Sequence, residues 1–355
     1  MTSPLRTAIL APIWLLQLVT GAKSFLDNPL IGSRRLNALG LHVARVRLAD
    51  SMTRWRRRRL AHRVRPEWRE AFDRDGFVAI ADIIPPHEFP ALREAVLGYS
   101  GPAREMRQGD AITRRMAVDA AMFDAIPALR ELLDRADIKA LFHYVASYRI
   151  TPLHYIQTIV SKVGGNEPDP QETLHADSFH SSLKAWLFFN PVNADEGPFT
   201  YVPGSHRLTP ERLAWERARS LADPRVVDRL SARGSPRIAD SQLESLRLPS
   251  SRGLAVPANT LVVADTVGFH CRGTSRRPGE RVELWSYARR NPYLPWLGGD
   301  PSSLPGIAER RVGLIWAARD RLAQWIGQPW QPVGKRRPVD HQHPKADHPA
   351  SPQDG

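Results

Sequence analysis

The chain has 355 residues, which is enough for one large domain with extensions or for two small domains. Its 50 Lys and Arg outnumber 37 Asp and Glu, and the formal net charge of +13 favours an acidic partner such as nucleic acid, an anionic membrane or an acidic protein. The single cysteine, Cys271, excludes a disulfide framework and predicts a reducing, cytoplasmic setting.

An apolar run over residues 8–19 is followed by a dense arginine cluster over residues 34–69. The run is shorter than the ~20 apolar residues of a membrane span. Its Trp and Leu content beside basic charge is typical of an interfacial helix, so one alternative is peripheral membrane contact through residues 8–65. The other alternative is a helix packed on the rest of the chain with a solvated arginine face. Export is disfavoured because positive charge follows the apolar run, and no nucleic-acid motif accompanies the arginines.

The first half of the chain is predicted to be mainly helical, and the second half is predicted to contain short strands separated by turns. Helices are predicted around 36–48, 89–99 and 127–144. Strands are predicted over 183–190, 198–202, 254–257, 260–264 and 282–288. Many short strands broken by turn residues predict a jelly-roll architecture.

The remaining segments complete the predicted organisation. Residues 208–248 are polar and arginine-rich, and we expect an insertion between strands that caps a site. Residues 307–326 have an amphipathic pattern and should pack on the strands. The resulting boundaries are an extension over 1–65, a jelly-roll domain over 66–295 with insertion 208–248, a helix within 296–330, and a disordered, Pro- and His-rich tail over 331–355.

The residues with the clearest chemistry are His175, Asp177 and, much later, His270. In a strand, residues i and i+2 project from the same face, so His175 and Asp177 can meet one ion. Two histidines and one carboxylate form the facial triad of non-haem iron(II) oxygenases, which leaves positions open for a co-substrate and O2. A His-x-Asp step alone favours an ordinary polar pair at a strand end, since chance matches are common.

Several motifs in order resemble the phytanoyl-CoA dioxygenase family of iron(II)/2-oxoglutarate oxygenases, over roughly residues 68–293. They are Phe72–Val78, His175-x-Asp177, Ala185-Trp186, Glu196-Gly197, Val202–His206, His270 and Arg281. The resemblance implies a mainly β fold with flanking helices: a double-stranded β-helix (jelly-roll, cupin-like) barrel buttressed by α-helices. It also implies that His175, Asp177 and His270 bind Fe(2+), and that Arg281 binds the distal carboxylate of 2-oxoglutarate through its planar fork.

Further co-substrate contacts follow from the same resemblance. Trp186 corresponds to a family tryptophan beside the co-substrate, and a plain core aromatic would also explain it. Thr158, and Arg114 or Arg115, lie in segments that match more loosely. The chain departs from the family at Arg272, where a small residue is usual, and His180 adds a nearby histidine that we assign to the substrate pocket or to the surroundings of the ligands.

The implied activity is oxidative decarboxylation of 2-oxoglutarate with O2, coupled to hydroxylation of a C–H bond. Asp177 favours hydroxylation, since related halogenases replace this carboxylate with a small residue. The alternatives are a metal-dependent jelly-roll enzyme that does not use 2-oxoglutarate and a catalytically silent, membrane-associated binding module. The basic charge leads us to expect a small-molecule or lipid-like substrate that is anionic.

Overall fold

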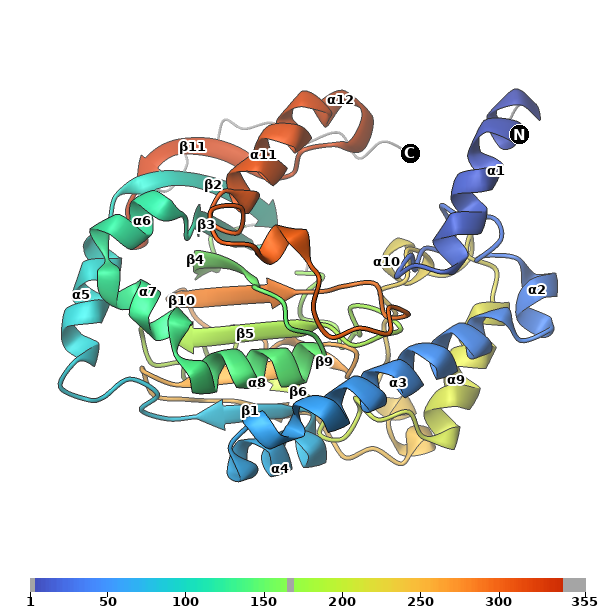
Figure 1. Cartoon of the computed structure of the whole chain (residues 1–355), viewed down its shortest axis with the longest axis horizontal. Coiled ribbons are helices and arrows are strands. Elements are labelled where there is room, and N and C mark those ends of the chain that lie inside the picture. Colours follow the sequence, from blue (N-terminus) through green and yellow to red (C-terminus); the bar gives the residue numbers. More distant parts are fainter. Residues whose placement is uncertain (1–3, 165–168, 341–355) are drawn as a thin grey trace.

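Two antiparallel sheets with helices packed around them make up the computed structural model, which describes residues 4–164 and 169–340 (Figure 1). The large sheet has the strand order β1-β8-β5-β10-β4-β3-β2-β11, and the small sheet has the order β7-β6-β9. The strands of the large sheet are β1 (Phe77–Ile80), β2 (Gly101–Gln108), β3 (Ala111–Ala117), β4 (Leu153–Ser161), β5 (Leu183–Phe188), β8 (Leu261–Asp265), β10 (Gly279–Ala288) and β11 (Gln331–Arg336). Those of the small sheet are β6 (Phe199–Tyr201), β7 (Arg252–Gly253) and β9 (His270–Arg272).

From β4 onward the chain alternates between the two sheets. After β4 in the large sheet, His175 bridges to His270 of β9 in the small sheet, and β5 returns to the large sheet. β6 and β7 then lie in the small sheet, β8 in the large, β9 in the small and β10 in the large. This alternation is the topology of a double-stranded β-helix, or jelly roll. The predicted mainly β fold with flanking helices is therefore confirmed.

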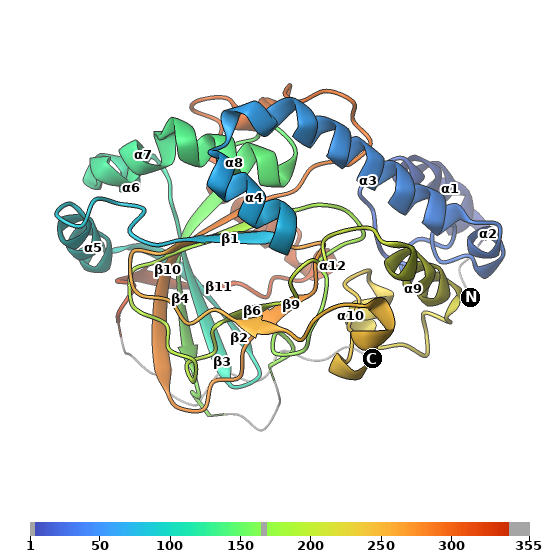
Figure 2. The same ribbon diagram turned by 90° about the horizontal axis from the view of Figure 1, so that it is seen from below.

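Helices α3 to α8 lie on one side of the large sheet, and α1 and α2 lie at the N-terminal end of the molecule (Figures 1 and 2). They are α1 (Pro4–Leu18), α2 (Arg34–Ala38), α3 (Leu41–Leu60), α4 (Pro66–Asp75), α5 (Phe89–Gly98), α6 (Ala120–Ala125), α7 (Pro127–Asp134), α8 (Ala136–Ala146), α9 (Pro210–Leu221), α10 (Arg229–Ala232), α11 (Arg311–Arg321) and α12 (Ala323–Ile326). Short 3-10 turns occur at Ala61–Arg63, Asp240–Gln242, Glu244–Leu246 and Pro301–Ser303.

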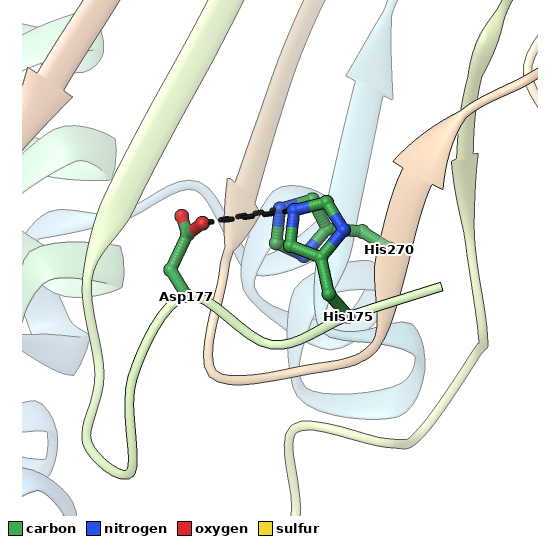
Figure 3. A group of neighbouring side chains, drawn as sticks. All are labelled: His175, Asp177 and His270. Atoms are coloured by element: carbon green, nitrogen blue, oxygen red, sulfur yellow. Dashed lines mark ion pairs between the residues drawn. The ribbon is translucent and has the colours of Figure 1, made fainter. Parts of the chain in front are cut away.

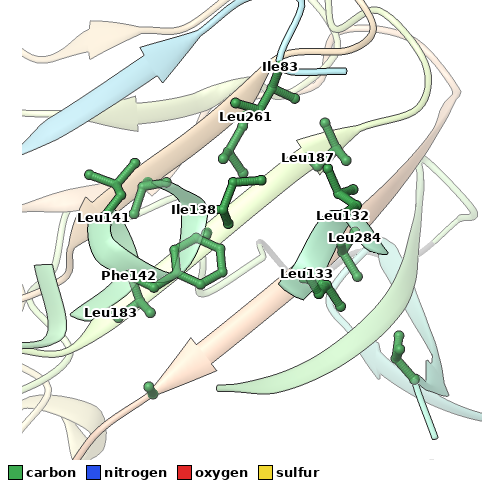
Figure 4. Packing of buried hydrophobic residues seen from close by; sticks show 14 of the residues in the cluster. Ile83, Leu132, Leu133, Ile138, Leu141, Phe142, Leu183, Leu187, Leu261 and Leu284 are labelled. Atoms are coloured by element: carbon green, nitrogen blue, oxygen red, sulfur yellow. The ribbon is translucent and has the colours of Figure 1, made fainter. Parts of the chain in front are cut away.

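The large sheet is buried on both faces, and strand alternation decides which side chain serves which face. On β5, Leu183 and Leu187 face the helices, where Leu183 lies beside Phe142 of α8 and Leu187 beside Leu132 of α7 (Figure 4). Trp186 of β5 points the other way, into a second cluster between the two sheets. One face of the sheet thus anchors the helices, and the opposite face is left to line the interior of the jelly roll.

Gly76 shows why the segment Phe72–Val78 is built as it is. Gly76 ends α4 in a left-handed conformation with φ +86, which favours glycine. A Cβ there would lie 2.6 Å from the Tyr201 hydroxyl and 2.5 Å from His206 Nδ1. The glycine therefore allows α4 to turn sharply into β1 while lying against the small sheet.

Two arginines of the N-terminal cluster, Arg56 and Arg57, bind α3 to the jelly-roll domain. Arg56 is fully buried and donates hydrogen bonds to the carbonyls of Ser147 (3.1 Å), Pro292 (3.0 Å) and Leu294 (2.9 Å). Arg57 pairs with the buried Asp265 at 2.6 Å. Arg56 and Arg57 are therefore used inside the molecule, whereas most arginines of the cluster remain exposed.

Peripheral membrane contact through residues 8–65 stays a prediction. α1 does form, and it exposes Ile13, Leu15 and Leu16. α3, in contrast, packs against α8 and α9 (Figure 2). Within the described residues, no helix combines the length and apolarity that a membrane crossing requires.

Several elements differ from the sequence prediction, among them the unpredicted strands β2, β3, β4 and β11. β2 and β3 form a hairpin that was not predicted, because β2 carries charged residues on a partly exposed edge and lacks a run of strand-forming residues. The prediction that the chain is disordered from residue 331 is wrong for Gln331–Arg336. These residues form β11, which pairs with β2. Backbone pairing to an open edge does not need an apolar sequence, so composition did not reveal it. Residues 341–355, including the rest of that tail, lie outside the described residues.

Candidate active site

His175, Asp177 and His270 converge at one edge of the small sheet (Figure 3). His175 and His270 are cross-strand partners that exchange both backbone hydrogen bonds at 2.9 Å. Asp177 Oδ1 lies 3.8 Å from Nε2 of His175 and 3.8 Å from Nε2 of His270. The three ligand atoms lie within 4.8 Å of one another, as the facial-triad prediction requires.

The hydrogen bonds around the triad present the correct atoms for a metal ion. Nδ1 of His175 lies 2.8 Å from the Thr173 carbonyl, and Nδ1 of His270 lies 3.0 Å from the Gly268 carbonyl. Each Nδ1 must therefore carry the proton, which leaves the Nε2 lone pairs to face the shared centre. His270 Nε2 is buried and has no hydrogen-bond partner among the described residues. The donor set thus fits a divalent metal with imidazole and carboxylate ligands.

Lys184 of β5 fixes the orientation of the carboxylate. Its Nζ lies 2.6 Å from Asp177 Oδ2, so Oδ1 is the oxygen that remains directed at the two histidines. Burial by itself would raise the pKa of Asp177, but the charges of Lys184 and the histidines lower it below its usual range. The strand alternation that places Trp186 inward places Lys184 inward too, although the sequence analysis did not single it out.

The histidines are neutral at physiological pH. Burial lowers the pKa of His270 to about 4, and burial followed by the neighbouring His270 lowers the pKa of His175 well below its ordinary value. Asp177 is ionised under the same conditions. The protein therefore holds all three groups in the protonation states that bind metal without first releasing a proton from the histidine Nε2 atoms.

The triad lines a cavity of about 420 Å³ that opens between the two sheets. Arg281 of β10 and Trp186 of β5 line the same cavity, as predicted. Trp186 also stacks near Phe199 of β6, with ring centroids 4.3 Å apart, so it serves both as core and as cavity wall. Arg272 reaches the cavity and pairs with Asp169 at 2.6 Å.

A chain of hydrogen bonds holds Arg281 in place. Glu283 is fully buried and accepts from Arg281 Nε (2.8 Å) and Gln157 Nε2 (2.5 Å). Arg115 in turn donates to Gln157 Oε1 at 2.7 Å. Arg281 Nη1 donates to the Gly197 carbonyl at 2.6 Å, so its Nη2 is the nitrogen that keeps donors for a ligand.

Thr158 and Arg114 do not line this cavity. Thr158 donates to the Pro338 carbonyl at 2.9 Å, and Arg114 binds Glu105 at 2.7 Å. Both lie on the outer face of the large sheet, because neighbouring strand residues point to opposite faces. The inward positions belong to Gln157 and to Arg115, the alternative that the sequence left open.

His180 also lies apart from the triad. It lines a smaller cavity with His206 and Arg57 on the side of α3, and it is not among the residues of the metal cavity. His180 therefore does not line the metal cavity, and its assignment to the substrate pocket or to the surroundings of the ligands stays a prediction.

The fold and the site define a class: a double-stranded β-helix protein with a His-Asp-His metal centre facing an arginine-lined cavity. Residues 72–244 match the family model described as phytanoyl-CoA dioxygenase (PhyH). Over these residues the chain is therefore similar to the phytanoyl-CoA dioxygenase family. The match includes His175 and Asp177 and ends before His270 and Arg281. No curated protein matches the chain.

Similar solved structures are enzymes described with 2-oxoglutarate. The epimerase SnoN, crystallised with Fe3+, alpha-ketoglutarate and nogalamycin RO, is 20% identical, with 68% of this chain and 90% of SnoN covered at a TM-score of 0.41. The carbocyclase SnoK from nogalamycin biosynthesis is 18% identical, with 77% and 98% covered at a TM-score of 0.41. HygX from Streptomyces hygroscopicus, with nickel, 2-oxoglutarate and hygromycin B bound, is 14% identical, with 63% and 87% covered at a TM-score of 0.40.

Proposed function

We propose that this protein is an iron(II)- and 2-oxoglutarate-dependent oxygenase that hydroxylates a C–H bond of a small molecule. The observation that supports it best is the convergence of His175, Asp177 and His270 on one wall of a cavity that also holds Arg281. The family match over residues 72–244 supports the same chemistry. Bound iron would activate O2 together with 2-oxoglutarate, whose decarboxylation drives the oxidation.

Each residue of the site has a definite task in this proposal. The triad would hold the metal on one face and leave the opposite face to the co-substrate and O2. Arg281 would bind the distal carboxylate of 2-oxoglutarate with Nη2, while Glu283 and Gly197 fix the rest of its guanidinium. Trp186 and Phe199 provide an apolar wall that excludes water from the reacting centre.

Hydroxylation is favoured over halogenation by Asp177. Its carboxylate would occupy the coordination position that a halide needs, and Lys184 holds that carboxylate in the ligand orientation.

The first test is anaerobic binding of iron(II) and 2-oxoglutarate by the full-length protein, followed on the metal-to-ligand charge-transfer band. We expect a band that requires both partners and that is lost in His175→Ala. Arg281→Ala should weaken 2-oxoglutarate binding at least about tenfold, since it removes a charge-assisted hydrogen bond. His87→Ala and Arg277→Ala are matched controls, because both residues are exposed and neither lines the cavity of the triad.

The absence of a band in wild-type protein with bound iron would contradict 2-oxoglutarate dependence. A band of normal intensity in His175→Ala would contradict the assignment of the metal ligands. Loss of 2-oxoglutarate binding in Arg277→Ala would show that general positive charge, rather than Arg281, attracts the co-substrate.

A further inference from the structure

The cavity beside the triad carries far more positive than negative charge. Its described lining contains the cations Lys23, Arg115, Lys184, Arg237, Arg272, Arg281 and Arg289. Asp177 is the one carboxylate among the same lining residues. Within the described part of the chain, Arg272, Arg281 and Lys184 have carboxylate partners in Asp169, Glu283 and Asp177. The remaining cations call for another explanation.

Lys23 reaches this cavity from the N-terminal extension. Its Nζ donates to the backbone carbonyl of Asp177, so the charge sits directly beside the metal site. The segment that precedes Lys23 is fixed by Arg45 of α3, which donates to the carbonyls of Leu18 (3.0 Å), Thr20 (3.0 Å) and Ala22 (2.6 Å). The placement of Lys23 is therefore built into the fold.

The insertion supports Lys23 from the other side. A Cβ at Gly234, which has φ +83, would lie 2.2 Å from the Lys23 carbonyl oxygen. Phe25 N also donates to the Ala232 carbonyl of α10 at 2.9 Å. The extension and the insertion thus pack tightly together at the wall of the cavity, and α1 and α10 lie on the same side of the molecule (Figure 1).

Arg237 and Arg289 line the same cavity as Lys23 and add two positive charges to it. Arg237 forms a backbone bridge with His175, and its guanidinium donates to the carbonyls of Ser235 (2.7 Å) and Pro170 (3.3 Å). Arg289 directly follows β10 and lines the cavity mouth. In the described residues, neither arginine nor Lys23 is ion-paired with a carboxylate through its side chain.

The charges of a divalent metal, Lys184, its partner Asp177 and the two carboxylates of 2-oxoglutarate would cancel. Arg281 would hold the distal end of 2-oxoglutarate, away from Lys23. The charges of Lys23, Arg237 and Arg289 would then remain uncompensated in a partly enclosed site, where unpaired cations strongly attract anions.

We propose that Lys23, Arg237 and Arg289 bind an oxyanion on the substrate, a carboxylate or a phosphate, beside the metal site. This inference rests on the proposed function, because it takes the metal and 2-oxoglutarate to occupy the triad and Arg281. Lys23 touches the backbone of Asp177 and Arg237 pairs with that of His175, so the carbon that is oxidised lies close to the anionic group. The substrate class is therefore a small acid or phosphate ester that enters with its anionic end near the metal.

The test is calorimetric titration of the full-length protein, loaded with metal and saturated with 2-oxoglutarate, using inorganic phosphate and acetate as probes. Wild-type protein should bind one of the two oxyanions. Lys23→Gln and Arg237→Gln should each weaken that binding at least about tenfold, since each removes a charge-assisted hydrogen bond. Lys23→Arg should retain binding, and Lys139→Gln, which alters an exposed lysine on α8, should be unchanged. Tighter binding of phosphate or of acetate distinguishes a phosphate ester from a carboxylate.

Equal oxyanion binding by wild type, Lys23→Gln and Arg237→Gln would overturn the proposal, as would no binding by wild type. The 2-oxoglutarate charge-transfer band is measured on the same samples and should be unaffected by the control variant Lys139→Gln. If that band is absent from the wild type, the proposed function fails. The oxyanion titration then proceeds on metal-free protein, where the same comparison still decides the anion site.

Discussion

At the scale of single residues, Glu283 is a buried carboxylate that lies deep in the cavity wall without ligating the metal. It is fully shielded from solvent and accepts hydrogen bonds from Arg281 and Gln157. Without it, Arg281 would lose the partner that holds its Nε and would be free to leave the co-substrate position. Glu283 is therefore a positioning residue that acts through Arg281.

Glu283→Gln should weaken 2-oxoglutarate binding about tenfold, or about 1.4 kcal/mol, and leave iron(II) affinity unchanged. The amide keeps the size of the side chain but loses the charge that orients Arg281. The charge-transfer band gives both affinities. Glu131→Gln, an exposed position on α7, serves as the control. Equal loss of iron and 2-oxoglutarate affinity in Glu283→Gln would indicate general damage to the fold.

At the scale of elements, α3 joins the N-terminal extension to the catalytic domain through side chains. Arg56 satisfies carbonyls on the α8–β4 connection and on the segment after β10, and its guanidinium lies 4.0 Å from the centre of the Tyr148 ring. Burial lowers the pKa of Arg56 to about 10, so it stays charged at physiological pH. Two segments far apart in the sequence are thus held together by one side chain.

Arg56→Leu should lower the free energy of unfolding by roughly 3 kcal/mol, because it leaves several buried carbonyls without donors. Arg58→Leu, on the exposed side of the same helix, should change it by less than about 0.5 kcal/mol. Urea denaturation of both variants measures the difference. Similar stability in the two variants would mean that water replaces the Arg56 donors.

At the scale of the whole molecule, buried neutral histidines make stability depend on pH. Burial and then Arg311 lower the pKa of His154 to about 3, from an ordinary value of 6.5. Its ring pairs with Ser286 Oγ at 2.7 Å. A histidine with a depressed pKa contributes stability above 6.5, and this contribution is lost as pH falls toward 3 because the unfolded chain takes up the proton first.

We therefore expect His154→Gln to remove about 1.4 kcal/mol per pH unit from the acid dependence of unfolding between pH 6.5 and 5. The glutamine amide can still bond Ser286. Denaturant unfolding at pH 7, 6 and 5, for wild type and variant, measures the slope. Identical slopes in the two proteins would show that His154 does not titrate on unfolding in this range.

The sequence predicted much of this architecture and missed specific parts for physical reasons. The triad, Arg281 and Trp186 reach the same cavity, because ligand spacing and strand alternation are local properties. Arg114 and Thr158 were assigned one position away from the inward-facing Arg115 and Gln157, and a shift of one residue reverses the face. Lys23 could not be predicted, since it reaches the site through packing between distant segments.

Segments that flank the jelly roll also line the cavity. Lys23 precedes β1, and Trp330, which lies 4.4 Å from the Arg115 guanidinium, follows β10. The metal ligands, by contrast, come from the jelly roll itself. Exchange of the flanking segments would therefore change the wall of the cavity while leaving the three metal ligands in place. A chimera that carries the flanks of one relative on the core of another should adopt the selectivity of its flanks.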